Sequence, residues 1–377
     1  MPEVTRPDAT PRRDFMKGAA TGILILAPQI VKGYQAKSAL SVGLIGCGRR
    51  GTAITNFFAQ NEFAKVAALC DIYDDQIAQA AQKFSGARHF KNMDDVLASN
   101  VDAVYIATPP YLHPPHFEAA VKARKHIFME KPAGVDPAGV KRVVEAAKKA
   151  DKTKRITIDF QQRYGKDYKK AYEIVKSGQL GKIVEVRASW LSGGLPLREG
   201  HPNDQEQMRN WLFYREKSGD FIVEQDCHNL DVVNWFTGMH PTKAAGYGGR
   251  MVRMSPGNIM DNLALTYHFD NGLVFSYSAN QISKGGFQDV SETFICENGA
   301  INTSRKGYKL YNGGKEPVVV TTSYDITKDA VDDFVDGARN GRLENAAFSA
   351  AESTLTGIMG REAIYSGKEK TWEMMQA

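Results

Sequence analysis

A glycine-rich turn between two apolar runs constrains the fold of this chain more than any other feature. Residues 41–46 are typical of a buried parallel strand, and residues 46–51 (Gly-Cys-Gly-Arg-Arg-Gly) have the pattern G-x-G-x-x-G. Residues 52–60 are predicted to be helical, and a second apolar run at 66–70 ends in Asp71. A strand, a glycine turn, a helix and a strand with a terminal acid, all within about 30 residues, predict a dinucleotide-binding unit.

The residue types in this turn suit such a ligand. Glycines let the backbone approach a pyrophosphate, and the start of the following helix offers free N–H groups. Asp71 could accept hydrogen bonds from a ribose diol and repel a 2′-phosphate, which favours NAD over NADP, although a nearby arginine weakens this preference. The alternative is that the glycines only permit tight helix–strand packing. The cofactor-binding residues predicted here are Gly46, Gly48, Arg49, Arg50, Gly51 and Asp71.

The alternation of helices and strands continues to about residue 160. Ligands of open α/β sheets bind outside the carboxyl ends of the strands, and four polar residues follow predicted strands here. They are Thr108, His113, Lys131 and Gln162. Helices are predicted at residues 75–84, 93–98, 113–124 and 137–150, and strands at residues 101–107, 126–129 and 155–160.

The second half of the chain has a different pattern. The sequence Asp-Asn-Gly at residues 270–272 is a hairpin signal between two strand-like runs. A meander of strands after an alternating α/β half predicts a second domain. We place a dinucleotide-binding domain at residues 39–160 and a substrate-binding and oligomerisation domain at 161–377, whose last helices could pack back on the first domain. Strands are predicted at residues 184–190, 263–269, 273–279 and 292–296.

Composition narrows the class of protein. A chain of 377 residues with 42% hydrophobic and 24% charged residues suits about two soluble domains with large cores and no integral membrane domain. Its four cysteines have neither disulfide nor zinc spacing, and we predict no metal. The net charge of +5 is dispersed along the chain, so we expect no nucleic-acid partner.

The first 38 residues have the layout of an export signal. Arg12, Arg13 and Phe15 precede an apolar run at residues 18–28 that is short for a membrane span, which needs about 20 residues. Paired arginines are typical of the twin-arginine (Tat) pathway, which exports folded proteins. We predict a leader over residues 1–38 that contacts the Tat machinery, and a periplasmic or secreted protein. The alternative is a disordered tail that happens to contain two arginines.

Three short motifs give the chain a family resemblance. Residues 46–51 (GCGRRG), 107–113 (ATPPYLH) and 130–132 (EKP) occur in the order and spacing of the glucose–fructose oxidoreductase, inositol dehydrogenase and MocA (Gfo/Idh/MocA) family, which the chain resembles over residues 41–377. The resemblance implies a Rossmann domain with a parallel sheet, followed by an α/β domain with an open, mostly antiparallel sheet. It also predicts closing helices at residues 330–340 and 353–372.

The same resemblance implies a nicotinamide cofactor, NAD or else NADP. Glu130 and Pro132 would position Lys131 near the nicotinamide. An exported enzyme would hold its cofactor tightly, because free NAD is not expected outside the cytoplasm. His113 could instead be a structural residue. The residues implied to lie around the cofactor are Thr108, Pro109, His113, Glu130 and Lys131.

Residues 221–231 contain a second group of polar residues. On one continuous helix, Glu224 and His228 would stand on the same face. His228 matches the catalytic histidine of the family's Asp-x-x-x-His pattern, but Glu224 replaces the aspartate and Asp226 replaces a common glycine. We predict His228 as general base, Lys131 as stabiliser of a developing alkoxide, and Glu224 as the residue that orients His228 or acts as a further acid or base. Alternatively, Lys131 is a surface lysine and His228 a core histidine.

Candidate substrate-binding residues occur in two further stretches. Two polar residues follow the strand predicted at 155–160, and residues 208–215 mix aromatic and basic side chains. Aromatic faces stack on the C–H surfaces of sugars, and arginines bind hydroxyl groups. Either stretch could instead begin a helix or fill a core. The substrate-binding residues predicted are Arg163, Tyr164, Arg209, Trp211 and Asp226.

These features predict an NAD(P)-dependent oxidoreductase that moves a hydride between a carbinol of a sugar or sugar derivative and its cofactor, in a homo-oligomer. A second prediction is an NAD-dependent, redox-neutral glycosidase that oxidises a sugar transiently at C3 and eliminates the anomeric group. The carboxylates of Glu224 and Asp226 favour it. A non-catalytic cofactor-binding protein would not need both Lys131 and His228. Part of the basic excess lies in the leader, and the remainder suits an uncharged sugar.

Overall fold

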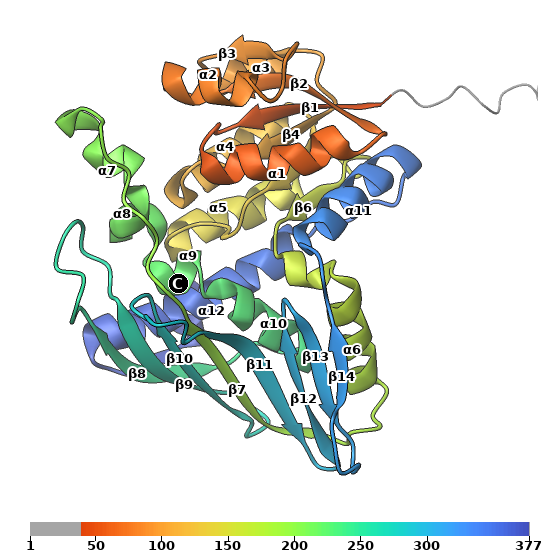
Figure 1. Ribbon diagram of the computed structural model, residues 1–377, viewed down its shortest axis with the longest axis vertical. Coiled ribbons are helices and arrows are strands. Elements are labelled where there is room, and N and C mark those ends of the chain that lie inside the picture. The colour runs from red at the N-terminus through yellow and green to blue at the C-terminus, as the bar shows by residue number, and fades with distance from the viewer. Residues whose placement is uncertain (1–38, 377) are drawn as a thin grey trace, which may run out of the picture. The chain divides into compact units, whose positions relative to one another are not determined.

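The computed structural model describes residues 39–376, and its first layer is a parallel sheet in the order β3-β2-β1-β4-β5-β6 (Figure 1). The order in which strands are added to the sheet reverses between β1 and β4, as it does in dinucleotide-binding sheets. The predicted leader, residues 1–38, lies outside the described residues. The strands are β1 (Leu40–Ile45), β2 (Ala64–Cys70), β3 (Arg88–Phe90), β4 (Ala103–Ile106), β5 (His126–Met129) and β6 (Ile156–Ile158).

Two apolar cores enclose this sheet, one on each face. Tyr105 and its neighbour Val104 on β4 belong to different cores, because successive side chains of a strand point to opposite faces. Phe58 and Phe334 pack in the core of Tyr105. The helices of this domain are α1 (Arg49–Gln60), α2 (Asp74–Ala81), α3 (Met93–Ala98), α4 (His113–Lys122) and α5 (Pro137–Lys148). The continuous apolar runs of the sequence are therefore strands buried on both faces.

The second layer is a nine-stranded sheet in the order β14-β13-β12-β11-β7-β10-β9-β8-β15. Only β7 and β10 pair in parallel, and the other neighbours are antiparallel. The predicted fold class is confirmed. The strands are β7 (Ile183–Leu191), β8 (Lys243–Gly249), β9 (Asn262–His268), β10 (Val274–Asn280), β11 (Asp289–Cys296), β12 (Gly299–Ser304), β13 (Gly307–Tyr311), β14 (Val318–Thr321) and β15 (Lys370–Thr371).

Helices lie on one face of the nine-stranded sheet (Figure 1). Along β9 and β10 every second residue is buried and the residues between are mostly exposed, so the opposite face is open. The last long helices also return to the first domain, where α11 packs on α1 and α12 packs on α5. The helices concerned are α6 (Lys166–Lys176), α10 (Cys227–Thr237), α11 (Thr327–Asn340) and α12 (Ala347–Ser366).

Two predicted helices are wrong in extent. The closing helix predicted at 353–372 ends at Ser366, because Gly367 adopts a left-handed conformation with φ of +62°; the short β15 and α13 (Trp372–Gln376) follow. The helix assumed for Glu224 and His228 is interrupted, since α9 (Phe221–Glu224) and α10 are separate. No helix in residues 39–376 is long and apolar enough to cross a membrane.

Candidate active site

The glycine turn lies at the carboxyl end of β1, beside the place where the strand order reverses. Gly46 has a φ of +97°, and a Cβ on Gly51 would lie 2.0 Å from the Gly46 carbonyl oxygen, so both positions require glycine. A Cβ on Gly48 would meet only the Arg198 guanidinium, at 3.5 Å. The turn therefore leaves open space over Gly48, which fits the close approach of a pyrophosphate.

Asp71 follows β2 and joins the glycine turn. One carboxylate oxygen accepts a hydrogen bond from the backbone N–H of Cys47 at 2.8 Å, and the other accepts one from Tyr73 at 2.9 Å. Burial raises the pKa of Asp71, while these two hydrogen bonds act in the opposite direction. Asp71 lines a cavity of about 420 Å³, the glycine-turn cavity, together with Gly46, Gly48, Thr108 and Pro109.

Arg50 is not free to hold a phosphate. Its guanidinium donates to Glu130 at 2.9 Å, to Asp159 at 2.6 Å and to Gln161 at 2.9 Å. Tyr105 donates a further hydrogen bond to Glu130 at 2.7 Å. This network anchors the Glu-Lys-Pro segment to the end of the sheet, so Arg50 positions neighbouring residues, while Arg198 lies beside Gly48 of the turn.

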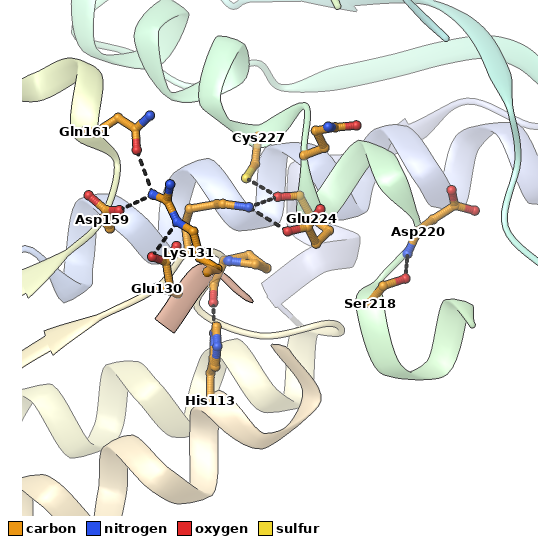
Figure 2. A network of polar contacts seen from close by, with 12 residues as sticks. His113, Glu130, Lys131, Asp159, Gln161, Ser218, Asp220, Glu224 and Cys227 are labelled. Carbon is orange, nitrogen blue, oxygen red and sulfur yellow. Dashed lines mark hydrogen bonds and ion pairs between the residues drawn. The ribbon is translucent and has the colours of Figure 1, made fainter. Parts of the chain in front are cut away.

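Lys131 extends from the end of β5 toward the break between α9 and α10 (Figure 2). Its ammonium group donates to the Glu224 carboxylate at 2.8 Å and to the Glu224 backbone carbonyl. Burial is the largest single effect and lowers the pKa of Lys131, but the opposing effects of Glu224, Cys227 and Glu130 together outweigh it, and the net pKa is raised. Lys131 is therefore a buried cation at neutral pH, and Glu224 pairs with it; the prediction that Glu224 orients His228 is wrong.

His228, in the first turn of α10, lies between aromatic rings. The Trp190 ring stacks on its imidazole at 6.0 Å and 15°, and Phe160 meets it edge-on at 6.0 Å. Its Nδ1 is buried without a hydrogen-bond partner in the described structure. Burial and the positive charges of Arg305 and Lys131 hold the pKa of His228 well below its usual range. The imidazole is therefore neutral at neutral pH, as a general base requires.

Lys131 and His228 line one cavity of about 490 Å³, the lysine–histidine cavity, together with Glu224 and Trp190. This cavity adjoins the glycine-turn cavity, since several residues line both. They are Ala107, Thr108, Arg198, Arg209 and Trp211. A cationic donor and a neutral base thus face a space beside the turn that fits a pyrophosphate.

His113 connects two strand ends and is one of the residues that line the lysine–histidine cavity. Its Nδ1 contacts the Pro132 carbonyl oxygen at 2.6 Å, and its Nε2 contacts that of Thr108 at 2.8 Å (Figure 2). Burial lowers the pKa of His113. With both ring nitrogens engaged, His113 holds the end of β4 against the segment that carries Lys131. Its place supports the structural interpretation of this residue.

Three predicted substrate-binding residues do not reach either cavity. The Arg163 guanidinium makes a two-pronged ion pair with Asp231, its shortest contact being 2.8 Å. Tyr164 is buried in the first domain's core. Asp226 is fully enclosed behind the site, and burial raises its pKa well above the usual range, which favours its neutral form. The structure contradicts these three predictions, because Arg163 and Tyr164 turn toward partners distant in sequence and Asp226 is enclosed.

Arg209 and Trp211 do line both cavities. Arg209 forms an ion pair with Asp75 at 2.7 Å and lies over the Tyr73 ring at 3.9 Å.

Three residues that line the lysine–histidine cavity were not predicted from the sequence. They are Trp190, which an alternating strand places on a buried face, and Arg198 and Arg305, which no motif signals. No group of His, Cys, Asp and Glu residues within 39–376 could hold a metal ion.

Two family models match the chain. Residues 40–158 match the model "Oxidoreductase family, NAD-binding Rossmann fold", and residues 168–302 match "GFO/IDH/MocA C-terminal domain". The two matches together span more than half of the 377 residues.

Individual proteins resemble the chain over most of its length. A myo-inositol 2-dehydrogenase of Thermotoga maritima is 25% identical over 68% of this chain and 72% of its own. A 2,7-anhydro-N-acetylneuraminate hydratase of Escherichia coli K12 is 28% identical over 62% of this chain and 59% of its own. A solved levoglucosan dehydrogenase, in complex with NADH and levoglucosan, superposes with a TM-score of 0.76 at 18% identity, covering 89% of this chain and 99% of its own.

Proposed function

We infer, from the premise that this chain belongs to the Gfo/Idh/MocA family of NAD-dependent oxidoreductases acting on CH–OH groups, that its substrate is a sugar or a sugar derivative. Two relatives point in this direction by name, one as an inositol dehydrogenase and one as a levoglucosan dehydrogenase. The observation that carries the proposal is the lysine–histidine cavity, in which Lys131 and His228 line one space beside the glycine turn.

Each side chain in this cavity has a separate task in the proposal. A bound nicotinamide supplies the hydride acceptor. The neutral imidazole of His228 takes the proton of the substrate hydroxyl, and the cationic Lys131 stabilises the negative charge that develops on the oxygen. Glu224 keeps Lys131 charged despite its burial. Trp190 stacks on His228 and fixes the plane of the ring.

Replacement of Lys131 by Met tests this assignment. We expect kcat to fall about 100- to 1000-fold, because the variant has no charge to stabilise the alkoxide, while the amount of bound cofactor is unchanged. Lys122→Met, at an exposed position of α4, is the matched control and should behave like the unchanged protein. Full turnover of Lys131→Met would contradict the mechanism.

We propose NAD as the cofactor, bound tightly enough to stay with the protein during purification. Asp71 supports NAD because its carboxylate lines the glycine-turn cavity, where it would repel a 2′-phosphate. Mass spectrometry of the natively purified protein identifies the cofactor directly. Asp71→Ser should raise the KM for NAD about tenfold and reduce the preference for NAD over NADP. An unchanged ratio of the KM values for NAD and NADP would contradict the assignment.

A redox-neutral elimination is the second candidate, and the name of the hydratase relative gives it weak support. The carboxylates of Asp226 and Glu224 add little support to it, because Asp226 is enclosed and Glu224 is paired with Lys131. Nitrophenyl glycosides separate the two reactions. Release of nitrophenol without net reduction of the bound cofactor would identify the elimination, whereas a keto-sugar or lactone would identify the dehydrogenase.

We also propose export and self-association. The paired arginines Arg12 and Arg13 support a Tat leader, and Arg12→Lys with Arg13→Lys should retain the protein in the cytoplasm in a cell-fractionation experiment.

The open face of the nine-stranded sheet, on which Tyr247 is 83% exposed, supports a homo-oligomer. A monomeric mass in solution by light scattering would overturn that proposal.

A further inference from the structure

The cations around the lysine–histidine cavity differ in whether they have a partner. Lys131 is paired with Glu224, Arg50 with Glu130 and Asp159, and Arg209 with Asp75. Arg305 lines the same cavity and, like Arg49 and Arg198 at the glycine turn, makes no ion pair with any carboxylate in residues 39–376. Its Nε is also enclosed without a hydrogen-bond partner. A largely buried guanidinium without an ion-pair partner is unusual, since burial of an unpaired charge is costly, and the carboxylates of Asp159 and Asp325 act on Arg305 only from beyond contact distance.

Arg305 occupies a built position in the fold. It stands in the turn between β12 and β13, and its guanidinium carbon lies 5.4 Å from the centre of the Trp190 ring. Trp190 in turn stacks on His228. The cation–π contact fixes the guanidinium beside the reacting groups but supplies no negative charge.

The cofactor does not account for this free cation. The arginines that would face a dinucleotide, Arg198 and Arg209, line the glycine-turn cavity as well as the lysine–histidine cavity. Arg305 lines only the lysine–histidine cavity. The Arg305 charge therefore lies on the substrate side of the lysine–histidine cavity. The glycine turn would hold the pyrophosphate of a cofactor elsewhere, in the glycine-turn cavity.

We propose that Arg305 binds a carboxylate of the substrate, so that this enzyme acts on sugar acids rather than on neutral sugars. The inference rests on the proposed function, because it names the substrate class of the same cavity. A planar guanidinium fork matches a carboxylate with two parallel hydrogen bonds. Such a substrate supplies the ion-pair partner that Arg305 does not have within residues 39–376.

The same pairing assists the proton transfer. The Arg305 charge is among the causes that disfavour protonation of His228. A carboxylate bound to Arg305 cancels much of that charge at the moment when His228 accepts the substrate proton. Anionic substrates therefore gain in kcat as well as in KM, whereas a purely structural Arg305 would treat acidic and neutral sugars alike.

Paired sugars test the proposal on the holoenzyme. D-glucuronate and D-galacturonate are compared with D-glucose and D-galactose, by calorimetry for binding and by the absorbance of the reduced cofactor for turnover. We expect the acids to bind about 10- to 100-fold more tightly, and Arg305→Gln to remove this preference. Arg305→Lys should restore part of it. Lys306→Gln, the neighbouring exposed residue, removes a charge from the same turn and should preserve the preference.

The inference would be overturned if acids and neutral sugars bind equally, or if the preference for acids survives Arg305→Gln. In either case, turnover of either sugar would still support the proposed function. A preference that depends on Arg305 without any cofactor reduction would support the anion site and refute the oxidoreductase proposal for these sugars. Tighter binding of glucose 6-sulfate than of glucuronate would overturn the assignment to a carboxylate. Melting curves of both Arg305 variants check that each variant is folded.

Discussion

At the scale of single residues, the candidate site depends on two opposite pKa shifts. Burial lowers the pKa of Lys131, but Glu224 and its neighbours together raise it overall, and the pKa of His228 is lowered by burial and nearby cations. A cation and a neutral base therefore coexist in one cavity at neutral pH. Without Glu224, only burial and the other charges would act on Lys131.

Glu224→Gln tests this dependence. The raised pKa of Lys131 keeps its ammonium charged as the pH rises, and without the Glu224 carboxylate burial lowers that pKa. We expect the alkaline limb of the kcat profile to move to lower pH, with kcat at neutral pH falling about tenfold or more. Glu224→Asp keeps the charge and should retain the position of the limb. An unshifted limb in Glu224→Gln would show that Lys131 is not the group that titrates.

At the scale of secondary-structure elements, two irregular junctions build the site. The break between α9 and α10 ends the helix at Glu224, whose backbone carbonyl accepts a hydrogen bond from Lys131. The junction from β1 to α1 is the glycine turn, where Gly51 packs against the Gly46 carbonyl. One junction positions Lys131 and the other shapes the glycine-turn cavity.

Alanine at the two helix-side glycines separates packing from ligand binding. A Cβ at Gly51 would lie 2.0 Å from the Gly46 oxygen, so Gly51→Ala should lower the free energy of unfolding by about 1–3 kcal/mol. Gly48 has open space and a φ of −63° that alanine tolerates, so Gly48→Ala should keep its stability and lose cofactor affinity. Urea unfolding and cofactor titration measure the two effects. Equal loss of stability in both variants would contradict the assignment.

At the scale of the whole described structure, buried polar contacts join layers that are far apart in the sequence. Glu292 on β11 accepts hydrogen bonds from Asn229 of α10 at 2.6 Å, from Thr303 of β12 at 2.7 Å and from Tyr168 of α6 at 3.2 Å. Burial raises its pKa to about 7. Glu292 thus joins the sheet to its covering helices, and in the folded state it keeps its proton up to a higher pH than an exposed glutamate does.

This group gives the fold a pH dependence. A carboxyl group with a raised pKa in the folded state stabilises that state at low pH, and the stability is lost as pH rises from its usual 4.5 to about 7. Glu292→Gln removes this loss, so the variant should gain about 3 kcal/mol relative to the unchanged protein between these pH values. Urea unfolding across the range measures it. Glu316→Gln, in an exposed loop, is the control, and an equal gain there would refute the argument.

The sequence by itself determined the first domain, its glycine turn and the candidates Lys131 and His228, because these depend on local rules: apolar runs, backbone freedom at glycine, and residues at strand ends. Only the tertiary structure decided the partners. Glu224 pairs with Lys131, 93 residues away, and Arg163 pairs with Asp231, 68 residues away. A charged side chain takes the nearest opposite charge in space, and chain order does not reveal that distance. For the same reason no motif indicated Arg305, whose lack of an ion-pair partner within residues 39–376 is a property of the folded cavity.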